Sequence, residues 1–290
     1  GRKLAVSFHV VGNSGPMTWH AKALQTSYLT APRSGSHSSE ESETNFPYTT
    51  ASWYFLDAVE VMAPTETSVV VCFGDSITDG TLSTLNGDDR WPDVLSRRLH
   101  AAYGNRFSVV NAGIGGNQIT GPEKYSAAAP VPGGPSALER LERDVLSLSG
   151  VTHILWLEGI NDLSRGASAE AVIAGMKELV QRVRAKGKIK VIGATITSGV
   201  GYNGPAGTAD VNARRQVVNQ FIRTGGLFDG VVDFDAATVD AQTGALRAAF
   251  QPNSTIGGAG DKLHPNRAGY QAMGNSIDLK LFVPATGKQK

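Results

Sequence analysis

The sequence predicts no disulfide, no membrane span and no strongly charged surface. Cys72 is the only cysteine among 290 residues, so no disulfide forms within the chain and sites built from several thiolates are excluded. No window approaches about 18 consecutive apolar residues, and we expect no integral membrane segment. Since 27 Lys and Arg residues stand against 26 Asp and Glu, the formal net charge is +1, without the basic excess of a nucleic-acid binder.

The composition of the sequence and its pattern of apolar residues predict a globular protein in two parts. Hydrophobic residues make up 41% and charged residues 18%, enough apolar material for a large core. Residues 1–64 form a β-rich segment by pattern: apolar side chains alternate over residues 4–10, and Trp53–Val61 is again strand-like. Two or three strands do not make a stable sheet alone, so we expect this segment to pack on the rest or to continue a β-rich region preceding Gly1. The alternating side chains are Leu4, Val6, Phe8 and Val10.

Residues 65–290 alternate between short apolar strands and amphipathic helices. This alternation implies right-handed crossovers and a parallel sheet with helices on both faces, an α/β fold. In such sheets, functional groups gather beyond the carboxyl ends of the strands. The predicted strands are Ser68–Phe73, Phe107–Asn111, Thr152–Leu157, Ile189–Ala194 and Val231–Phe234. The predicted helices are Arg90–Tyr103, Ser136–Leu148, Ala169–Lys186, Ala209–Arg223 and Asn266–Leu281.

Four polar, glycine-containing motifs fall at the positions where a site is expected. Three follow the first three strands in turn, and the fourth directly precedes the last helix. Because these positions correspond in the predicted fold, they indicate one candidate site rather than scattered surface. The motifs are GDSITDG (Gly74–Gly80), NAGIGGN (Asn111–Asn117), EGIND (Glu158–Asp162) and DKLHP (Asp261–Pro265).

Ser76 and His264 are the candidate nucleophile and base. Ser76 follows a strand and precedes a helical turn, where its Oγ is either exposed for attack or used as a helix cap. The motif is not the nucleophile elbow G-x-S-x-G, because Thr78 stands where that motif has glycine. Asp261, three residues before His264, can reach the imidazole within a turn and fix its tautomer. The other five histidines lack such a setting and are interpreted as structural.

Acyl transfer also needs hydrogen-bond donors for the developing oxyanion. The backbone N–H groups of Ser76 and Gly116 are candidates, with the side chain of Asn161 as a third. The alternatives are a tight turn at Gly116 and a loop cap at Asn161. Trp91, Tyr125 and Tyr202 are candidate walls for a substrate ring, with packing as the alternative for each.

Other chemistries fit the same motifs less well. Gly113–Gly116 lacks the spacing of a dinucleotide-binding fingerprint and does not follow the first strand. Asp75 and Asp79 are expected to stabilise a turn rather than hold Mg²⁺, since no phosphate loop accompanies them. Cys72, inside an apolar strand, is expected to be inert. We therefore expect no metal and no organic cofactor.

The four motifs together resemble those of the SGNH (GDSL-type) hydrolase superfamily, over about residues 66–282. The resemblance implies a flavodoxin-like three-layer α/β/α domain with a five-stranded parallel sheet. It also implies Ser76 as nucleophile, His264 as base and Asp261 as the acid of the triad, with Gly116 and Asn161 joining the Ser76 amide in the oxyanion hole. Further similarity at residues 90–93, 157–162 and 269–273 is to bacterial arylesterases and acylhydrolases found beside xylan-degrading enzymes, which are exported.

The resemblance implies a serine esterase acting on short, acetyl-like esters of carbohydrate or aryl alcohols. The expected partner is a small ester or an acylated carbohydrate, and the expected location is secreted or periplasmic. One alternative is a lysophospholipase- or thioesterase-like hydrolase of longer acyl chains. Another is a carbohydrate-binding protein that kept the fold without catalysis, and the complete set of motif residues counts against it.

Overall fold

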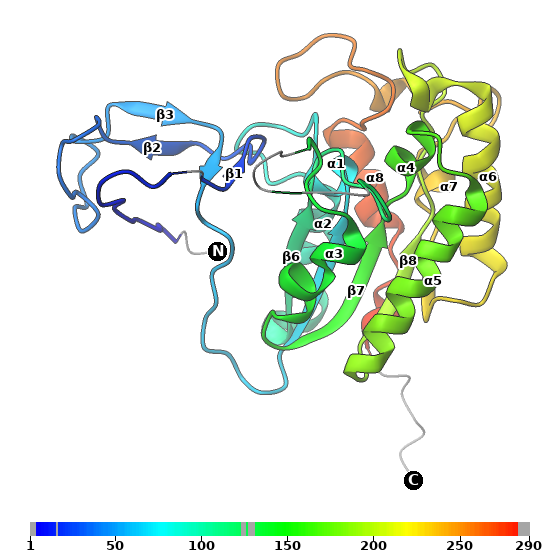
Figure 1. Cartoon of the computed structure of the whole chain (residues 1–290), viewed down its shortest axis with the longest axis horizontal. Helices are drawn as coiled ribbons and strands as arrows, with labels where there is room; N and C mark the ends of the chain where they lie inside the picture. The colour runs from blue at the N-terminus through cyan, green and yellow to red at the C-terminus, as the bar shows by residue number, and fades with distance from the viewer. Residues whose placement is uncertain (1–3, 16, 123–125, 127–130, 284–290) are drawn as a thin grey trace. The chain divides into compact units, whose positions relative to one another are not determined.

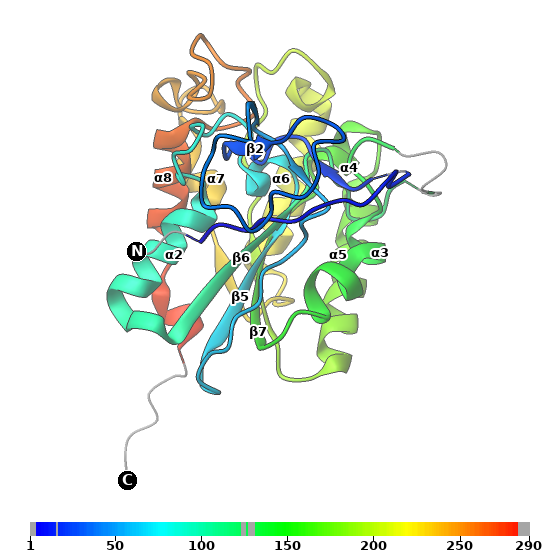
Figure 2. The same cartoon turned by 90° about the vertical axis from the view of Figure 1, so that its left-hand side faces the viewer.

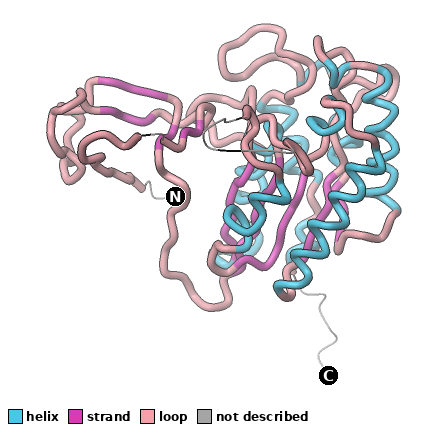
Figure 3. Tube along the Cα trace, in the orientation of Figure 1, coloured by secondary structure: helices cyan, strands magenta, loops and turns pink. Residues whose placement is uncertain are grey.

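The computed structural model describes residues 4–15, 17–122, 126 and 131–283, and the chain separates into two compact units, Gly1–Glu60 and Val61–Lys290. Each unit is a separate body with its own contacts. In the first, two short antiparallel pairs form (Figure 3). The pairs join β1 (Trp19–His20) to β4 (Trp53–Tyr54) and β2 (Ser27–Leu29) to β3 (Tyr48–Thr50).

Of the two strand predictions for this unit, the first is wrong and the second is too long. Residues 4–11, all of which are described, form no strand, and their alternating apolar side chains stay exposed, from 71% at Leu4 to 41% at Val10. With no neighbouring strand to pair with, alternation alone does not make a sheet. The strand predicted over Trp53–Val61 ends at Tyr54 because Phe55 has φ = +63°, outside the β region.

The second unit is built on a parallel sheet of five strands, which confirms the predicted fold class. Its strand order is β6-β5-β7-β8-β9, and Figure 1 shows the strands running between helices. Strand β6 thus lies on one side of β5, and β7, β8 and β9 follow in order on the other side. The strands are β5 (Ser68–Gly74), β6 (Phe107–Gly113), β7 (Val151–Leu157), β8 (Lys190–Ala194) and β9 (Gly230–Val232).

Helices cover both faces of this sheet. In Figure 2, α2 (Trp91–Tyr103) and α8 (Arg267–Ser276) lie on one side of the strands, and α3 (Ala137–Leu141) and α5 (Ala169–Lys186) lie on the other. The remaining α-helices are α1 (Ser76–Asp79), α4 (Ile160–Ser164), α6 (Ala209–Thr224) and α7 (Phe234–Thr238). A π-helical turn, η2 (Glu142–Leu146), continues α3, and the 3₁₀ turns are η1 (Gly104–Arg106), η3 (Pro205–Gly207), η4 (Ala248–Phe250) and η5 (Leu279–Phe282).

The two faces of β5 supply two separate apolar clusters. Val71 and Phe73 face the cluster that includes side chains of α3, α5 and α6, whereas Val70 and Cys72 face the cluster that includes those of α2 and α8. Alternate residues of a strand point to opposite faces, so a strand covered on both sides is apolar at every position. None of the described helices is long and apolar enough to cross a lipid bilayer.

The last helix is shorter than predicted. α8 ends at Ser276, and Ile277 takes an extended conformation with ψ = 121°. Arg98 donates hydrogen bonds to the carbonyls of Gly274 and Ile277, which occupies acceptors near the helix end. Asp278 then caps the separate 3₁₀ turn η5, so the helix predicted through Leu281 is interrupted at residues 277–278 and its last three positions lie in this turn.

Gly113 permits a close approach between β6 and α1. A Cβ atom at this position would lie 2.2 Å from the backbone nitrogen of Asp79, and backbone cannot move aside as a flexible side chain can. We expect Gly113→Ala to lower the free energy of unfolding by about 1–3 kcal/mol, measured by urea denaturation. Gly115→Ala is the matched control, because its methyl group would meet the nearest atom at 3.7 Å. Equal unfolding midpoints for the two variants would contradict this account.

Candidate active site

Ser76 lies where β5 leads into α1. The cap of this helix is Asp75, whose Oδ1 accepts a hydrogen bond from the N–H of Ile77 at 2.9 Å. The Ser76 side chain is therefore not the helix cap that its sequence position also allowed. As the first residue of α1, Ser76 presents a backbone N–H that has no acceptor within the helix.

The Ser76 hydroxyl contacts His264. Ser76 Oγ lies 2.7 Å from His264 Nε2, and His264 Nδ1 lies 2.6 Å from Asp261 Oδ2. Because an ionised carboxylate only accepts hydrogen bonds, a neutral imidazole here carries its proton on Nδ1 and turns the lone pair of Nε2 to the serine. The three side chains form a continuous hydrogen-bonded chain from carboxylate to hydroxyl.

Backbone donors hold the Asp261 carboxylate. Its Oδ1 accepts from the N–H groups of Leu263 at 3.0 Å and His264 at 2.9 Å, closing a turn in which Lys262 has φ = +67°. Burial raises the pKa of Asp261, but the hydrogen bonds and charge of His264 and the backbone donors outweigh it and lower the pKa to about 2. Asp261 therefore stays ionised at every pH at which a histidine serves as a base.

The loop that carries His264 is anchored on both sides. Leu263 is buried in the cluster around Ile196 and Ala206. Beyond the histidine, Asn266 caps α8 through its side chain, and Tyr270 in α8 donates from its hydroxyl to the carbonyl of Thr81 at 2.7 Å. This last bond ties α8 to the segment just after α1, and so ties the base to the nucleophile's own helix.

The second motif forms a turn beside the nucleophile. Asn117 donates its N–H to the carbonyl of Ile114 at 3.0 Å, and Gly116 within this turn has φ = +82°, a conformation that glycine adopts without strain. A Cβ atom at Gly115 would lie 3.9 Å from Ser76 Cβ. The turn therefore borders the nucleophile directly, with no side chain between them at that point.

Two side chains join the third motif to the second motif and to the segment just after it. Asn161 donates from Nδ2 to the carbonyl of Asn117 at 2.9 Å, which orients its carboxamide. Asp162 accepts from the N–H groups of Ile119 at 2.9 Å and Thr120 at 3.1 Å. Asp162 is a site residue that was not predicted, and its place directly after Asn161 in the motif was the available signal.

Two buried carboxyl groups lie beneath this site. Burial raises the pKa of Asp75 to about 7, against the hydrogen bond from Ile77 and the charge of His264. Burial likewise raises the pKa of Glu158 to about 8, although Arg140 and a hydrogen bond from Trp156 oppose the shift. Trp156 Nε1 donates to one Glu158 oxygen at 2.8 Å, and the other, Oε1, has no hydrogen-bond partner among the described residues.

The three aromatic residues predicted to wall the substrate have different outcomes. Trp91 is fully buried and packs against Phe234 with ring centroids 5.2 Å apart. The prediction for Trp91 is therefore wrong, because this ring at the start of an amphipathic helix faces the core. Tyr202 is half-buried and packs against the apolar cluster that contains Leu263. Tyr125 lies outside the described residues.

The alternative chemistries find little support in the geometry. Cys72 is a buried free thiol, and burial raises its pKa well above the ordinary value, which makes it unreactive. Asp75 serves as a helix cap. In the part of the chain that the structure describes, no three His, Cys, Asp or Glu side chains are grouped as metal ligands.

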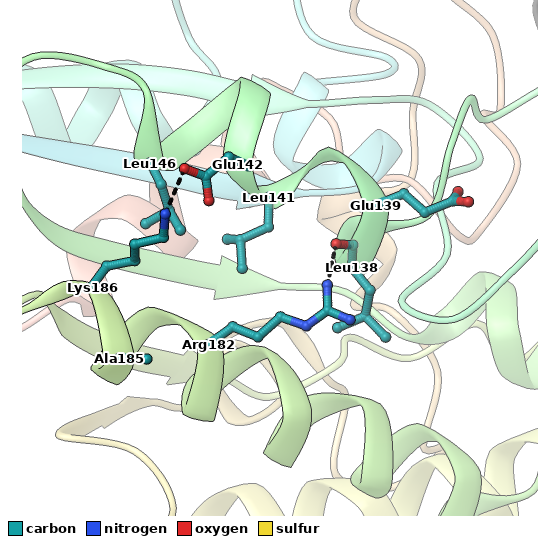
Figure 4. A pocket seen from close by; sticks show the side chains of 8 residues that line it. All are labelled: Leu138, Glu139, Leu141, Glu142, Leu146, Arg182, Ala185 and Lys186. Carbon is teal, nitrogen blue, oxygen red and sulfur yellow. Dashed lines mark hydrogen bonds and ion pairs between the residues drawn. The ribbon is translucent and has the colours of Figure 1, made fainter.

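Two surface pockets lie apart from Ser76. A pocket of about 370 Å³, shown in Figure 4, lies between α3, η2 and α5 and is rimmed by Arg182 and Lys186. Lys186 pairs there with Glu142 at 2.8 Å. A second pocket, of about 300 Å³, includes Lys262 of the Asp261–His264 turn in its lining. Ser76 lines neither of them.

Comparisons with known proteins agree with this arrangement. Residues 72–272 match the sequence model of the GDSL-like Lipase/Acylhydrolase family. No protein with a curated description matches the chain. Among solved structures, a lipolytic protein of the G-D-S-L family from Veillonella parvula is similar, with 21% identity over 72% of this chain and 96% of that one and a TM-score of 0.51.

Two further solved structures share the fold. A carbohydrate acetylesterase family member from Sinorhizobium meliloti is 16% identical, covering 72% of this chain and 95% of that one, with a TM-score of 0.53. The native aryl esterase of M. smegmatis has the same identity of 16%, the same coverage of 72% and 95%, and a TM-score of 0.53. At these identities the likeness is one of fold.

The raised pKa of Glu158 predicts how stability depends on pH. The folded protein holds a proton on Glu158 that the unfolded chain releases above its ordinary pKa, so the stabilising contribution is present below about pH 4.5 and lost as pH rises through about 8. Glu158→Gln should therefore flatten the fall in unfolding free energy between about pH 5 and 8, by on the order of 1–3 kcal/mol. Urea denaturation at a series of pH values measures this. Glu178→Gln, on an exposed face of α5, controls for loss of a carboxylate, and parallel curves for wild type and Glu158→Gln would contradict the prediction.

Proposed function

We propose that this chain, which belongs to the GDSL-like lipase/acylhydrolase family, hydrolyses short-chain carboxylic esters of carbohydrate or aryl alcohols. The proposed reaction passes through an acyl-enzyme on Ser76. Family membership makes the chain a carboxylic ester hydrolase. The observation that carries the assignment of its nucleophile is the hydrogen-bonded chain from Ser76 Oγ to His264, 2.7 Å, and on to Asp261, 2.6 Å. Nucleophile, base and orienting carboxylate are the three parts that serine acyl transfer needs.

In the proposed reaction, Ser76 attacks the ester carbonyl as His264 Nε2 takes the hydroxyl proton. Asp261 stabilises the imidazolium that forms. The tetrahedral oxyanion accepts hydrogen bonds from the N–H groups of Ser76 and Gly116 and from the Asn161 side chain. His264 then gives its proton to the departing alcohol, and a water molecule activated by the same histidine hydrolyses the acyl-enzyme.

A short acyl group is supported by the surroundings of the nucleophile. The Gly115 backbone borders Ser76, because a Cβ atom built there would lie 3.9 Å from Ser76 Cβ, and this close approach beside the nucleophile favours a small acyl group. The carbohydrate acetylesterase and the aryl esterase with the same fold point to similar substrates. The similarity of the motifs to those of exported relatives supports a secreted or periplasmic location.

Replacing the nucleophile tests the proposal. Wild-type protein should hydrolyse para-nitrophenyl esters with greatest kcat/KM at short acyl lengths, and Ser76→Ala should lose activity by on the order of 10⁴-fold or more. The matched control is Ser83→Ala, which removes another buried serine hydroxyl, one with no hydrogen-bond partner among the described residues, and it should retain activity. Substantial turnover by Ser76→Ala would exclude this nucleophile, and a maximum at eight or more carbons would favour a lysophospholipase- or thioesterase-like activity.

Replacing the orienting carboxylate tests the role of Asp261. In Asp261→Asn, the amide oxygen can keep the backbone bonds of the turn while the NH₂ group faces Nδ1, which moves the imidazole proton to Nε2 and removes the base. We expect kcat to fall on the order of 10³–10⁴-fold with the fold retained, measured by ester hydrolysis and circular dichroism. Asp278→Asn, which alters another aspartate that caps a turn, should leave kcat unchanged. A fall of less than about 10-fold in Asp261→Asn would show that the carboxylate does not set the tautomer.

A further inference from the structure

Arg140 is a buried cation whose guanidinium lies over the Phe73 ring, 4.0 Å from its centroid. Only 1% of the residue is exposed, and burial lowers the pKa of its guanidinium, against the charges of Glu158 and Asp144. Asp144 is its ion-pair partner at 3.2 Å. Since buried ion pairs are commonly replaceable by apolar side chains without loss of stability, the charge and shape of Arg140 call for a role beyond holding α3 in the core.

The guanidinium group joins three segments of the site. Its Nη2 donates to the carbonyl of Gly74 at 2.8 Å, two residues before Ser76. Its Nη1 donates to the carbonyl of Ala112 in β6 at 2.8 Å, and its Nε donates to Asn117 Oδ1 at 2.7 Å. A planar group with fixed donor directions thus sets the spacing between the strand that precedes the nucleophile and the turn beside it.

Asn117 extends this restraint to the proposed oxyanion donors. Its backbone N–H closes the turn that contains Gly116, and its carbonyl accepts from Asn161 Nδ2. Its side-chain nitrogen donates to the carbonyls of Gly133 at 2.6 Å and Pro135 at 2.7 Å. Every polar atom of Asn117 is therefore engaged, and Oδ1 is the atom that accepts from Arg140.

We infer, on the basis of the proposed function, that Arg140 is a positioning residue for the oxyanion hole, which its guanidinium aligns by binding Gly74, Ala112 and Asn117 at once. Oxyanion donors act only within about 2.7–3.1 Å of the developing charge, and a displacement of about 1 Å costs on the order of 10²-fold in rate. Lysine keeps the charge of arginine but presents one ammonium group, which cannot reach three acceptors in a plane.

The test compares Arg140→Lys and Arg140→Met with the same substitutions at Arg215. Arg215 is a matched control: it is also 1% exposed, and it donates to the Ile196 carbonyl at 2.7 Å and pairs with Asp235 at 2.6 Å, contacts that involve none of the four motifs. Active sites are counted by mass spectrometry after exhaustive labelling with a para-nitrophenyl phosphonate. Values of kcat and KM for para-nitrophenyl acetate are then expressed per labelled site.

Both Arg140 variants should lose kcat per labelled site by on the order of 10- to 100-fold, with KM within about threefold of wild type. The Arg215 variants should lower the number of labelled sites or the melting temperature while kcat per site stays within about threefold. Because only molecules with a competent serine are counted, partly misfolded preparations still give a result, and Arg140→Lys is the milder change. Unchanged kcat per site in the Arg140 variants would overturn the inference. Failure of the wild type to turn over any ester, or activity in Ser76→Ala, would instead overturn the proposed function.

Discussion

A single hydrogen bond of 2.7 Å joins Ser76 to His264 across 188 positions of sequence, and much of the second unit serves to make it possible. Ser76 is placed by the end of β5 and the cap on α1, and His264 by the start of α8. The position of β5 and α1 does not by itself determine the position of α8. The hydrogen bond from the Tyr270 hydroxyl to the Thr81 carbonyl and the burial of Leu263 keep the two elements, and with them Ser76 and His264, close together.

The order of the strands explains why the other motif residues meet at the same point. The sheet grows from β5 to β6 on one side and from β5 to β7 on the other, and loops at such a reversal diverge and leave a crevice at the carboxyl ends. The turn after β6 carries Gly116 and borders Ser76 through Gly115, and the helix after β7 carries Asn161 at the same end of the sheet. A hydrogen bond from Asn161 to Asn117 closes the arrangement.

Ionisable side chains are buried around Asp75, next to Ser76, although the sheet itself is apolar on both faces. Asp75, Arg140, Glu158 and Asp162 are all buried there, and the carboxyl groups among them have raised pKa values because burial disfavours their charged forms. Polar groups in a low-dielectric interior hold their partners in fixed directions. The rigidity that results suits a site whose donors must be in place before charge develops.

The five strands, the main helices, the family and the motif residues around Ser76 could all be predicted from the amino-acid sequence. This was possible because strand and helix periodicities are local and the motifs are short. Where the pattern was misleading, the cause was tertiary: residues 4–11 alternate but have no strand to pair with, and α8 ends early where Arg98 donates to the carbonyls of Gly274 and Ile277. Nothing in the predicted helix Ser136–Leu148 distinguishes Arg140 from its exposed neighbour Arg143. The folded structure shows that the Arg140 guanidinium bonds residues of two motifs whereas that of Arg143 is exposed, because this depends on which face of the helix meets the sheet.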